Sequence, residues 1–349
     1  VPRLDYSDGG CPSLLLEPAS TNLIVYSEDF SNASWGKSGN TVVTLNNVIS
    51  PDGTLNASTV TGLDGAGNND LYTQPTFNTS NKTVTYSVYL KGSGTLRIQV
   101  SNNVDDSSSK TLTLTNNWEK YFITYSFNAT ASTQIVCNLD DLSATATTYE
   151  VWGAQLEENS YATSYIKTVG TAQSRSADTA NGAGNSTVIN SSEGTLYFEG
   201  SALANDLSWR GIQLRKIGDG DDQVNIGYNT TTQQVISQVR VAGSLQYNQS
   251  FTLQDITTSN KIAILYAPNN FKVYINGVLA GTHITTGTTF SSNFLNTLEF
   301  NFLFGGSNFY GNTKQIQYYD SALNDSELEK LTSWTSFTAM ANGQSYTII

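Results

Sequence analysis

Histidine and cysteine are scarce in this sequence, which limits the chemistry that its side chains can perform. His283 is the one histidine, and Cys11 and Cys137 are the two cysteines, among 349 residues. A nucleophilic triad needs a general base, and a lone histidine on a polar strand is more commonly an ordinary surface residue. Zinc sites need several His or Cys ligands. The residues therefore favour neither hydrolysis by a nucleophilic triad nor a zinc centre. We also expect both cysteines to be reduced, with a single disulfide between them as the alternative.

Carboxylates are the more serious catalytic candidates, because glycoside hydrolysis needs only two of them at a fixed separation. The chain has 29 acidic residues. The closely spaced pairs Glu157-Glu158 and Glu327/Glu329 have unsuitable spacing and lie near the ends of predicted elements. We therefore expect that the protein is not an enzyme, with a polysaccharide depolymerase as the alternative.

Aromatic side chains beside turn residues offer a different chemistry, the stacking of sugar rings on flat faces. Trp209 lies in the polar segment 205–211, and Tyr228, Tyr247 and Tyr310 each flank turn-forming residues. The chain is also rich in Asn, Asp and Gln, whose side chains can hold sugar hydroxyls. These four aromatic residues are the predicted glycan-binding positions, against the alternative that they pack in a core.

Acidic loops supply the oxygen ligands that Ca²⁺ prefers. Glu28 and Asp29 are the candidates in the first half of the chain, and Asp219, Asp221 and Asp222 are those in the second half. Neither group matches the EF-hand pattern. Structural calcium is therefore a prediction, with solvated turn carboxylates as its alternative, and we expect no other cofactor.

The charge balance excludes some partners. With 17 basic and 29 acidic residues the net charge is −12, so a phosphate backbone and an anionic membrane surface would both be repelled. No stretch approaches the about 18 apolar residues that span a bilayer, and no signal peptide is visible. Because Met340 is the one methionine, we expect the chain to be processed or to be part of a longer one.

Composition and periodicity both predict an all-β protein. Charged residues make up only 13% of the chain, and 19 tyrosines accompany abundant Thr, Ser, Asn and Gly. Apolar residues alternate with polar ones over 84–90 and 121–127, as in half-buried strands. Asn276-Gly277 predicts a type I′ hairpin turn within 261–281. Asn324 and Glu327 predict the capping box of one short C-terminal helix.

These patterns divide the chain into two tandem antiparallel β-sandwich domains of the jelly-roll type. We expect an extended lead-in over residues 1–20 and the first sandwich over 21–167. A polar linker follows over 168–192, where apolar side chains are few. The second sandwich is expected over 193–333, and a tail over 334–349 forms a terminal strand or a packing arm.

The segments at the beginning and the end of the first predicted sandwich, together called the bracket, are similar to a known family. The sequence reads LLLEP at 14–18, TNL at 21–23 and SEDF at 27–30, and it ends with GAQLE at 153–157 and ATSYI at 162–166. This bracket resembles a carbohydrate-binding-module-like jelly roll found in tail-fibre and other structural proteins of bacteriophages. The resemblance implies a particle-surface or adhesion protein and names no ligand.

The second half carries another resemblance. FKVYING at 271–277, and the segment 309–331 with its FYG start and IQYY strand, are similar to the laminin-G/concanavalin-A-like lectin superfamily. The similarity covers about residues 193–333. It implies a lectin-like sandwich, but that fold hosts lectins, glycosidases and spacers alike.

Together the residues and the resemblances predict a non-enzymatic component of a phage virion, such as a fibre, tail or capsid-surface protein. It would bind host-surface glycans or decorate the particle, with a cell-surface polysaccharide and other virion subunits as partners. A purely structural subunit without a ligand and a secreted bacterial surface lectin stay as alternatives, the latter placing the chain outside the cell instead of on the virion surface. A homo-oligomer, a trimer included, stays open.

Overall fold

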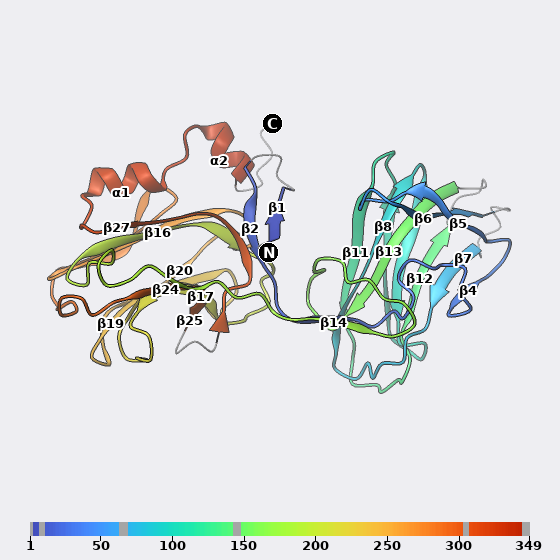
Figure 1. Ribbon diagram of the computed structural model, residues 1–349, viewed down its shortest axis with the longest axis horizontal. Coiled ribbons are helices and arrows are strands. Elements are labelled where there is room, and N and C mark those ends of the chain that lie inside the picture. Colours follow the sequence, from blue (N-terminus) through green and yellow to red (C-terminus); the bar gives the residue numbers. More distant parts are fainter. Residues whose placement is uncertain (1–2, 7–10, 63–68, 142–147, 303–306, 344–349) are drawn as a thin grey trace. The chain divides into compact units, whose positions relative to one another are not determined.

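Figure 1 shows the computed structural model, which describes residues 3–6, 11–62, 69–141, 148–302 and 307–343. The chain divides into two compact units. Unit 1 comprises residues 1–18 and 178–349, and unit 2 comprises residues 19–177. In sequence, unit 2 is therefore inserted between two parts of unit 1. Both units consist of antiparallel β-sheets packed as sandwiches, so the predicted fold class is confirmed.

Unit 2 contains two five-stranded antiparallel sheets, with the orders β10-β9-β12-β7-β4 and β11-β8-β13-β6-β5, and a small pair, β14 with β3. The strands are β3 Ser20–Asn22, β4 Trp35–Lys37, β5 Val42–Ile49, β6 Leu55–Thr61, β7 Asn69–Thr73, β8 Thr83–Gly92, β9 Thr95–Ser101, β10 Ser107–Thr113, β11 Glu119–Ser126, β12 Val136–Asp141, β13 Thr148–Glu157 and β14 Gln173–Arg175.

The core of unit 2 lies between its two large sheets and follows from strand alternation. Val84, Tyr86, Val88 and Leu90 of β8 are all completely buried and line this core, as the apolar alternation predicted. The strand is not half-buried, however, because Thr85 and Ser87 on its other face are also 0% exposed. The facing sheet contributes Leu71 and neighbours from β9 and β12. Side chains of opposite parity on β7, β9 and β12 consequently point away from this core.

Unit 1 contains a seven-stranded sheet, β1-β2-β27-β16-β21-β22-β23, a six-stranded sheet, β15-β24-β17-β18-β19-β20, and the small pair β25–β26. The strands are β1 Arg3–Asp5, β2 Ser13–Leu16, β15 Asn181–Ala183, β16 Gly194–Ala202, β17 Arg210–Arg215, β18 Gln223–Tyr228, β19 Gln234–Val241, β20 Ser244–Thr252, β21 Asn260–Ala267, β22 Asn270–Ile275, β23 Val278–Ile284, β24 Thr297–Glu299, β25 Asn301–Phe302, β26 Ser307–Asn308 and β27 Gly311–Tyr319.

The hairpin predicted at 261–281 is present as β22 and β23. Asn276 and Gly277 both adopt positive φ, at 49° and 90°, as a type I′ turn requires. The Asn276 side chain also accepts a hydrogen bond from the Lys261 backbone at 2.9 Å, so the turn is tied to the neighbouring strand. The β22–β23 hairpin therefore follows from the positive φ angles and the hydrogen bonding of its own turn residues.

Two helices, rather than the single one expected, follow the last strand. The predicted one is α1, Asp325–Thr332, and its capping box between Asn324 and Glu327 is confirmed. Its buried Leu328 packs against Tyr197 and Leu265, on the side of the seven-stranded sheet that faces away from the main core, and Figure 1 shows α1 along β16 and β27. The second, α2 (Phe337–Gly343), replaces the strand or arm expected for the tail. Within the described part of the chain, no helix is both long and apolar enough to cross a membrane.

The expectation of an extended lead-in over residues 1–20 is corrected. β1 pairs with β2, and β2 pairs with β27 in the register Leu14↔Thr313, so both strands extend the seven-stranded sheet of unit 1. Arg3 also forms ion pairs with Glu17 and Asp178. The position of β2 depends on its pairing with β27, roughly 300 residues away in the sequence, so no local sequence pattern could predict it.

The polar linker expected over 168–192 is also more structured than its composition indicated. Its first part supplies β14, which pairs with β3 in unit 2, and its second part supplies β15, which pairs with β24 in unit 1. The division between the units falls between residues 177 and 178. Cys11 is exposed in unit 1 and Cys137 is buried in unit 2, and both are free, as expected.

Candidate functional site

The outer face of the six-stranded sheet in unit 1 carries a row of polar side chains. Strand alternation sends Ile212 and Val224 into the core and turns their neighbours to this outer face. The cross-strand register aligns the row from β24 to β20. We call it the amide row, and its members are Glu299, Gln213, Asn225, Gln238 and Asn248.

Hydrogen bonds join the members of the amide row to one another and to β25. Gln213 Nε2 donates to Oδ1 of Asn301, and Asn301 Nδ2 donates to Oε2 of Glu299 at 3.1 Å. On the other side, Gln238 Nε2 donates to Oδ1 of Asn248 at 2.8 Å. The row is therefore a hydrogen-bonded strip across the sheet, with Asn248 exposed at its far end.

Two members of the row have polar atoms without a partner among the described residues. Gln213 and Asn225 are 0% exposed, and Gln213 Oε1 and Asn225 Oδ1 accept no hydrogen bond. Leaving a buried polar atom unsatisfied costs about 1–3 kcal/mol. A ligand hydroxyl or amide that reached this strip would supply the missing donors.

Two guanidinium groups flank the amide row. Arg215 and Arg240 both pair in register with Gln223, which places them in the next cross-strand row. Arg215 Nε lies 3.3 Å from Oε2 of Glu299, and Arg240 Nη1 donates to the carbonyl of Gly243 at 3.0 Å. Glu299 pairs with Arg215, and Asp222 directly precedes Gln223 and accepts from the Ala242 amide, so both signs of charge occur beside the strip.

An aromatic pair lies at the opposite flank of the row. The ring of Phe302 rests on Gly211 and Gly227, where a Cβ atom would come within 3.0 Å of it. Trp209 stacks on Phe302 with ring centroids 5.2 Å apart and an interplanar angle of 10°. Two glycines thus make room for an aromatic stack on the same face as the amides.

Tyr310 lies close to the predicted residue Trp209. Arg210 is ion-paired with Asp206, and its Nη1 lies 3.4 Å from the carbonyl oxygen of Tyr310. The Tyr310 hydroxyl accepts from Nδ2 of Asn308 at 3.2 Å. Both predicted aromatic residues are half-buried, with Trp209 directly before β17 of the six-stranded sheet and Tyr310 directly before β27 of the seven-stranded sheet.

The predictions for Tyr228 and Tyr247 are wrong. These side chains are 3% and 1% exposed and belong to the core between the two sheets of unit 1. Burial raises the pKa of both hydroxyls. The adjacent turn residues suggested exposure, but strand parity turned both rings inward, so neither can stack on a sugar.

The calcium candidates of unit 2 are engaged by protein groups. Glu28 accepts hydrogen bonds from the Tyr165 hydroxyl at 2.9 Å and from Lys167 at 2.7 Å. Asp29 accepts from the backbone amides of Ser31 and Asn32 at 3.2 and 3.1 Å, so it stabilises a turn.

The candidates of unit 1 also hold backbone amides. Asp219 accepts from the Asp221 amide at 2.8 Å, and Asp222 accepts from the Ala242 amide at 2.6 Å. Burial, with the charges of Asp219 and Asp221, raises the pKa of Asp222. Throughout the described ranges, no group of three or more His, Cys, Asp or Glu side chains is arranged to hold a metal. Structural calcium stays a prediction, and a melting curve with and without excess chelator tests it.

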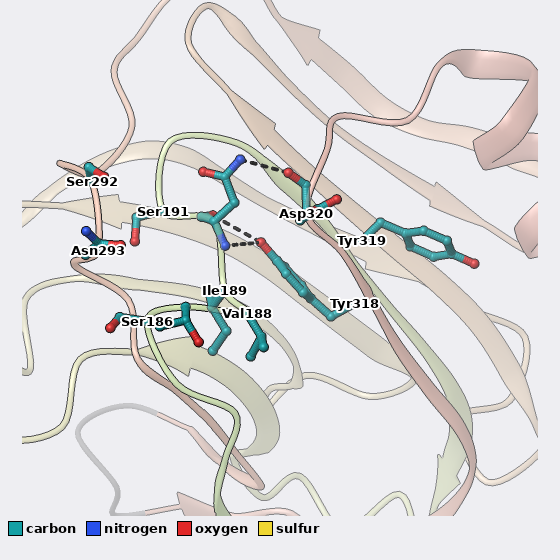
Figure 2. Close-up of a pocket in the computed structure, with 11 residues that line it drawn as sticks. Ser186, Val188, Ile189, Ser191, Ser292, Asn293, Tyr318, Tyr319 and Asp320 are labelled. Atoms are coloured by element: carbon teal, nitrogen blue, oxygen red, sulfur yellow. Dashed lines mark hydrogen bonds between the residues drawn. The ribbon is translucent and has the colours of Figure 1, made fainter.

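Apart from the amide row, unit 1 has a pocket with a volume of about 660 Å³, which is shown in Figure 2. Tyr318 and Asp320 form one wall, and Ser292 and Asn293 lie across from them. The Asn190 amide donates to the Tyr318 hydroxyl at 2.9 Å, and the Asn190 side chain donates to the Asp320 carbonyl at 2.8 Å. These polar groups satisfy one another, unlike those of the amide row.

Comparisons with known proteins give likenesses only to solved structures. No family model matches the chain, and no curated protein matches it. Solved structures give partial likenesses. The CBM40 of the Ruminococcus gnavus IT-sialidase bound to α2,3-sialyllactose is 19% identical with a TM-score of 0.34, over 44% of this chain and 94% of that one.

Two further likenesses are of the same order. A SAP-like pentraxin from Limulus polyphemus is 12% identical with a TM-score of 0.35, over 45% of this chain and 76% of that one. Trypanosoma rangeli sialidase is 16% identical with a TM-score of 0.34, over 40% of this chain and 22% of that one. Because all three TM-scores lie below 0.5, they carry no argument about what this chain binds.

Sequence reasoning missed the amide row. Its signal was present in the segments 210–215 and 223–228, where polar residues alternate with apolar ones. Such alternation predicts a strand with one solvent-facing side. It does not reveal that Gln213 and Asn225 are fully buried on that side, because the burial comes from neighbouring strands.

Proposed function

We propose that this chain is a non-enzymatic glycan-binding protein, and that unit 1 binds a polyhydroxylated sugar over its amide row. The observation that carries the proposal is the half-buried Trp209, which stacks on Phe302 beside the covered and unpartnered acceptors Gln213 Oε1 and Asn225 Oδ1. An apolar ligand would leave those acceptors unsatisfied. A sugar offers hydroxyl donors to the amides and an apolar ring face to Trp209.

Part of this proposal is that the chain is not an enzyme. Its support is that Glu157 and Glu327, two candidate catalytic residues, have structural roles, and that His283 lies exposed on a strand. Glu157 is 0% exposed and accepts hydrogen bonds from Ser20 at 2.5 Å and from the Thr163 amide at 3.0 Å. Glu327 completes the capping box of α1. His283 is exposed on β23, where its Nε2 lies 2.8 Å from Oδ1 of Asn270.

We further propose that this binding serves host-surface adhesion by a phage particle, with other virion subunits as partners. The support is the bracket resemblance, whose TNL and closing parts meet within unit 2, whereas its LLLEP part belongs to unit 1. Asn22 of the opening segment donates to the carbonyls of Ala154 and Ile166 in the closing segment, at 3.1 and 2.8 Å. Repeated copies on a particle would convert weak single-site binding into avidity. Immunogold labelling of purified particles with an antibody to this chain tests the location.

A glycan array screened with the chain in multivalent form tests the sugar-binding proposal. We expect saturable binding to one polysaccharide class, weakened about tenfold by Trp209→Ala. Tyr319→Ala is the matched control, because Tyr319 lines the Figure 2 pocket in the same unit. Equal loss in both variants, or loss only with Tyr319→Ala, would move the site away from the amide row. Silence of folded protein across the array would favour the purely structural role.

A further inference from the structure

Unit 2 has its own polar outer face, on the sheet β10-β9-β12-β7-β4. Leu71, Leu139 and Ile98 point into the core. Their strand neighbours therefore share the outer face. The register sets Arg97, Asp140 and Asp70 in one cross-strand row, and Gln99, Asn138 and Tyr72 in the next.

Tyr72 forms an aromatic platform on this face. Gly36, its partner on β4, has no side chain, and a Cβ added there would lie 2.2 Å from Cζ of Tyr72. The end of the ring therefore lies directly over the backbone of β4. The ring is only half-buried, so part of it stays accessible beside the two polar rows.

Next to this platform lies a buried amide with an unused acceptor. Asn138 is 9% exposed, and its Nδ2 lies 3.3 Å from Oδ1 of Asp70. Its Oδ1 accepts no hydrogen bond from the described residues, and Arg97 Nε likewise has no acceptor among them. A buried acceptor and a buried donor without partners thus lie in neighbouring cross-strand rows, and Tyr72 belongs to the row of the acceptor.

The two carboxyl groups of this face set its charge. Asp140 is 4% exposed and is ion-paired with Arg97. Burial, and then a hydrogen bond with Asp70, raises the pKa of Asp140 to about 6. Burial also acts on Asp70, but hydrogen bonds from Asp140 and Ser38 outweigh it and lower the Asp70 pKa. At neutral pH two carboxylates therefore face a single guanidinium, which disfavours an anionic ligand.

We propose that this outer face of unit 2 is a second binding site, separate from the amide row, for a neutral saccharide. A sugar ring packs against Tyr72. Its hydroxyl groups donate to Asn138 Oδ1 and to the carboxylates of Asp70 and Asp140, and a hydroxyl oxygen accepts from Arg97 Nε. Gln99 lies in register beside Asn138 and extends the polar floor.

Titration calorimetry on the full chain tests this site. The probes are maltohexaose, cellohexaose and mannohexaose, with hexagalacturonate as the anionic counterpart. We expect Trp209→Ala protein to bind at least one neutral probe, and both Tyr72→Ala and Asn138→Ala in that background to weaken the binding about tenfold or more. Tyr72→Phe keeps the ring and should keep the affinity. Phe122→Ala, an exposed aromatic change on β11 of the opposite sheet, should have no effect.

The outcomes separate the two sites. Loss of neutral-probe binding with Tyr72→Ala but not with Phe122→Ala supports the proposal, whatever Trp209→Ala does at the amide row. Unchanged binding in both Tyr72→Ala and Asn138→Ala protein of wild-type melting temperature overturns it. Failure of the wild-type chain to bind any neutral probe, or equally tight binding of hexagalacturonate at this face, also overturns it.

Discussion

The outer sheet faces of unit 1 and unit 2 have the same combination of side chains but differ in their charged groups. Each sets an aromatic ring on glycine beside a row of amides with unpartnered atoms. In unit 1 the ring is Phe302, which carries Trp209, and in unit 2 it is Tyr72. The charged groups differ, because two guanidinium groups flank the first face, whereas a carboxyl pair with one guanidinium occupies the second.

The difference shows that a glycine under an aromatic ring can serve two purposes. At Gly211 an added Cβ would lie 2.6 Å from the carbonyl oxygen of Ile226, so the glycine is needed for the strands to approach. At Gly36 the three nearest atoms all belong to the far end of the Tyr72 ring, which can move. The first glycine therefore maintains the fold, and the second only positions a ring.

The largest effect that follows from this comparison is on stability. We expect Gly211→Ala to lower the free energy of unfolding by about 1–3 kcal/mol, because backbone must shift to admit the methyl group. Gly36→Ala should change it by only about 0.5 kcal/mol, since the Tyr72 ring can swing aside. Urea unfolding of both full-length variants measures the two values, and equal losses would remove the distinction.

The next effect is a dependence of unit 2 on pH. Because the pKa of Asp140 is raised to about 6 from 3.8, the folded state holds a proton that the unfolded chain releases. Its contribution is fully present below pH about 4 and is lost as the pH rises through about 6. Lowering the pH from 7.5 to 5.5 should raise the melting temperature of unit 2 by about 2–4 °C.

Asp140→Asn is the variant that sharpens this test. It keeps a hydrogen-bonding side chain of the same size and removes the titration. The variant should show a flatter melting temperature of unit 2 between pH 7.5 and 5.5 than the wild type. An unaltered pH dependence in Asp140→Asn protein would assign the effect to another group.

A smaller effect separates binding from stability at the amide row. Asn225→Leu removes the unpartnered Oδ1 but also the hydrogen bond that Nδ2 donates to Gln238 Oε1 at 3.4 Å. The two effects oppose each other, so the free energy of unfolding should change by no more than about 1 kcal/mol in either direction. Glycan binding on the array should fall. Lower stability together with unchanged binding would mean that the amide serves the fold alone.

The smallest effect concerns the two thiols, which alter neither face. Cys11 is exposed in unit 1, whereas Cys137 is 0% exposed in unit 2 and burial raises its thiol pKa. A maleimide reagent should label one thiol in folded protein and two after denaturation. Mass spectrometry counts the labels, and rapid double labelling of the native chain would show that unit 2 opens around β12.

Features specified within a few residues could be read from the sequence. The Asn276-Gly277 turn and the Asn324–Glu327 capping box each depend on contacts between near neighbours, and both are present as predicted. The alternation of β8 also correctly indicated its buried face. Of the four predicted aromatic residues, Trp209 and Tyr310 are half-buried and their glycan-binding role stays a prediction, whereas Tyr228 and Tyr247 are in the core because strand parity turns them inward.

The all-β class, the turns, the first helix and the scarcity of histidine and cysteine follow from the amino-acid sequence. The pairing of β2 with β27, the covered face of each strand and the amides without partners became known from the fold. The two groups of features differ in the sequence separation of the residues that produce them. Turn and cap energies arise between residues two to four apart, whereas burial and cross-strand neighbours such as Leu14 and Thr313 arise from pairings across hundreds of residues.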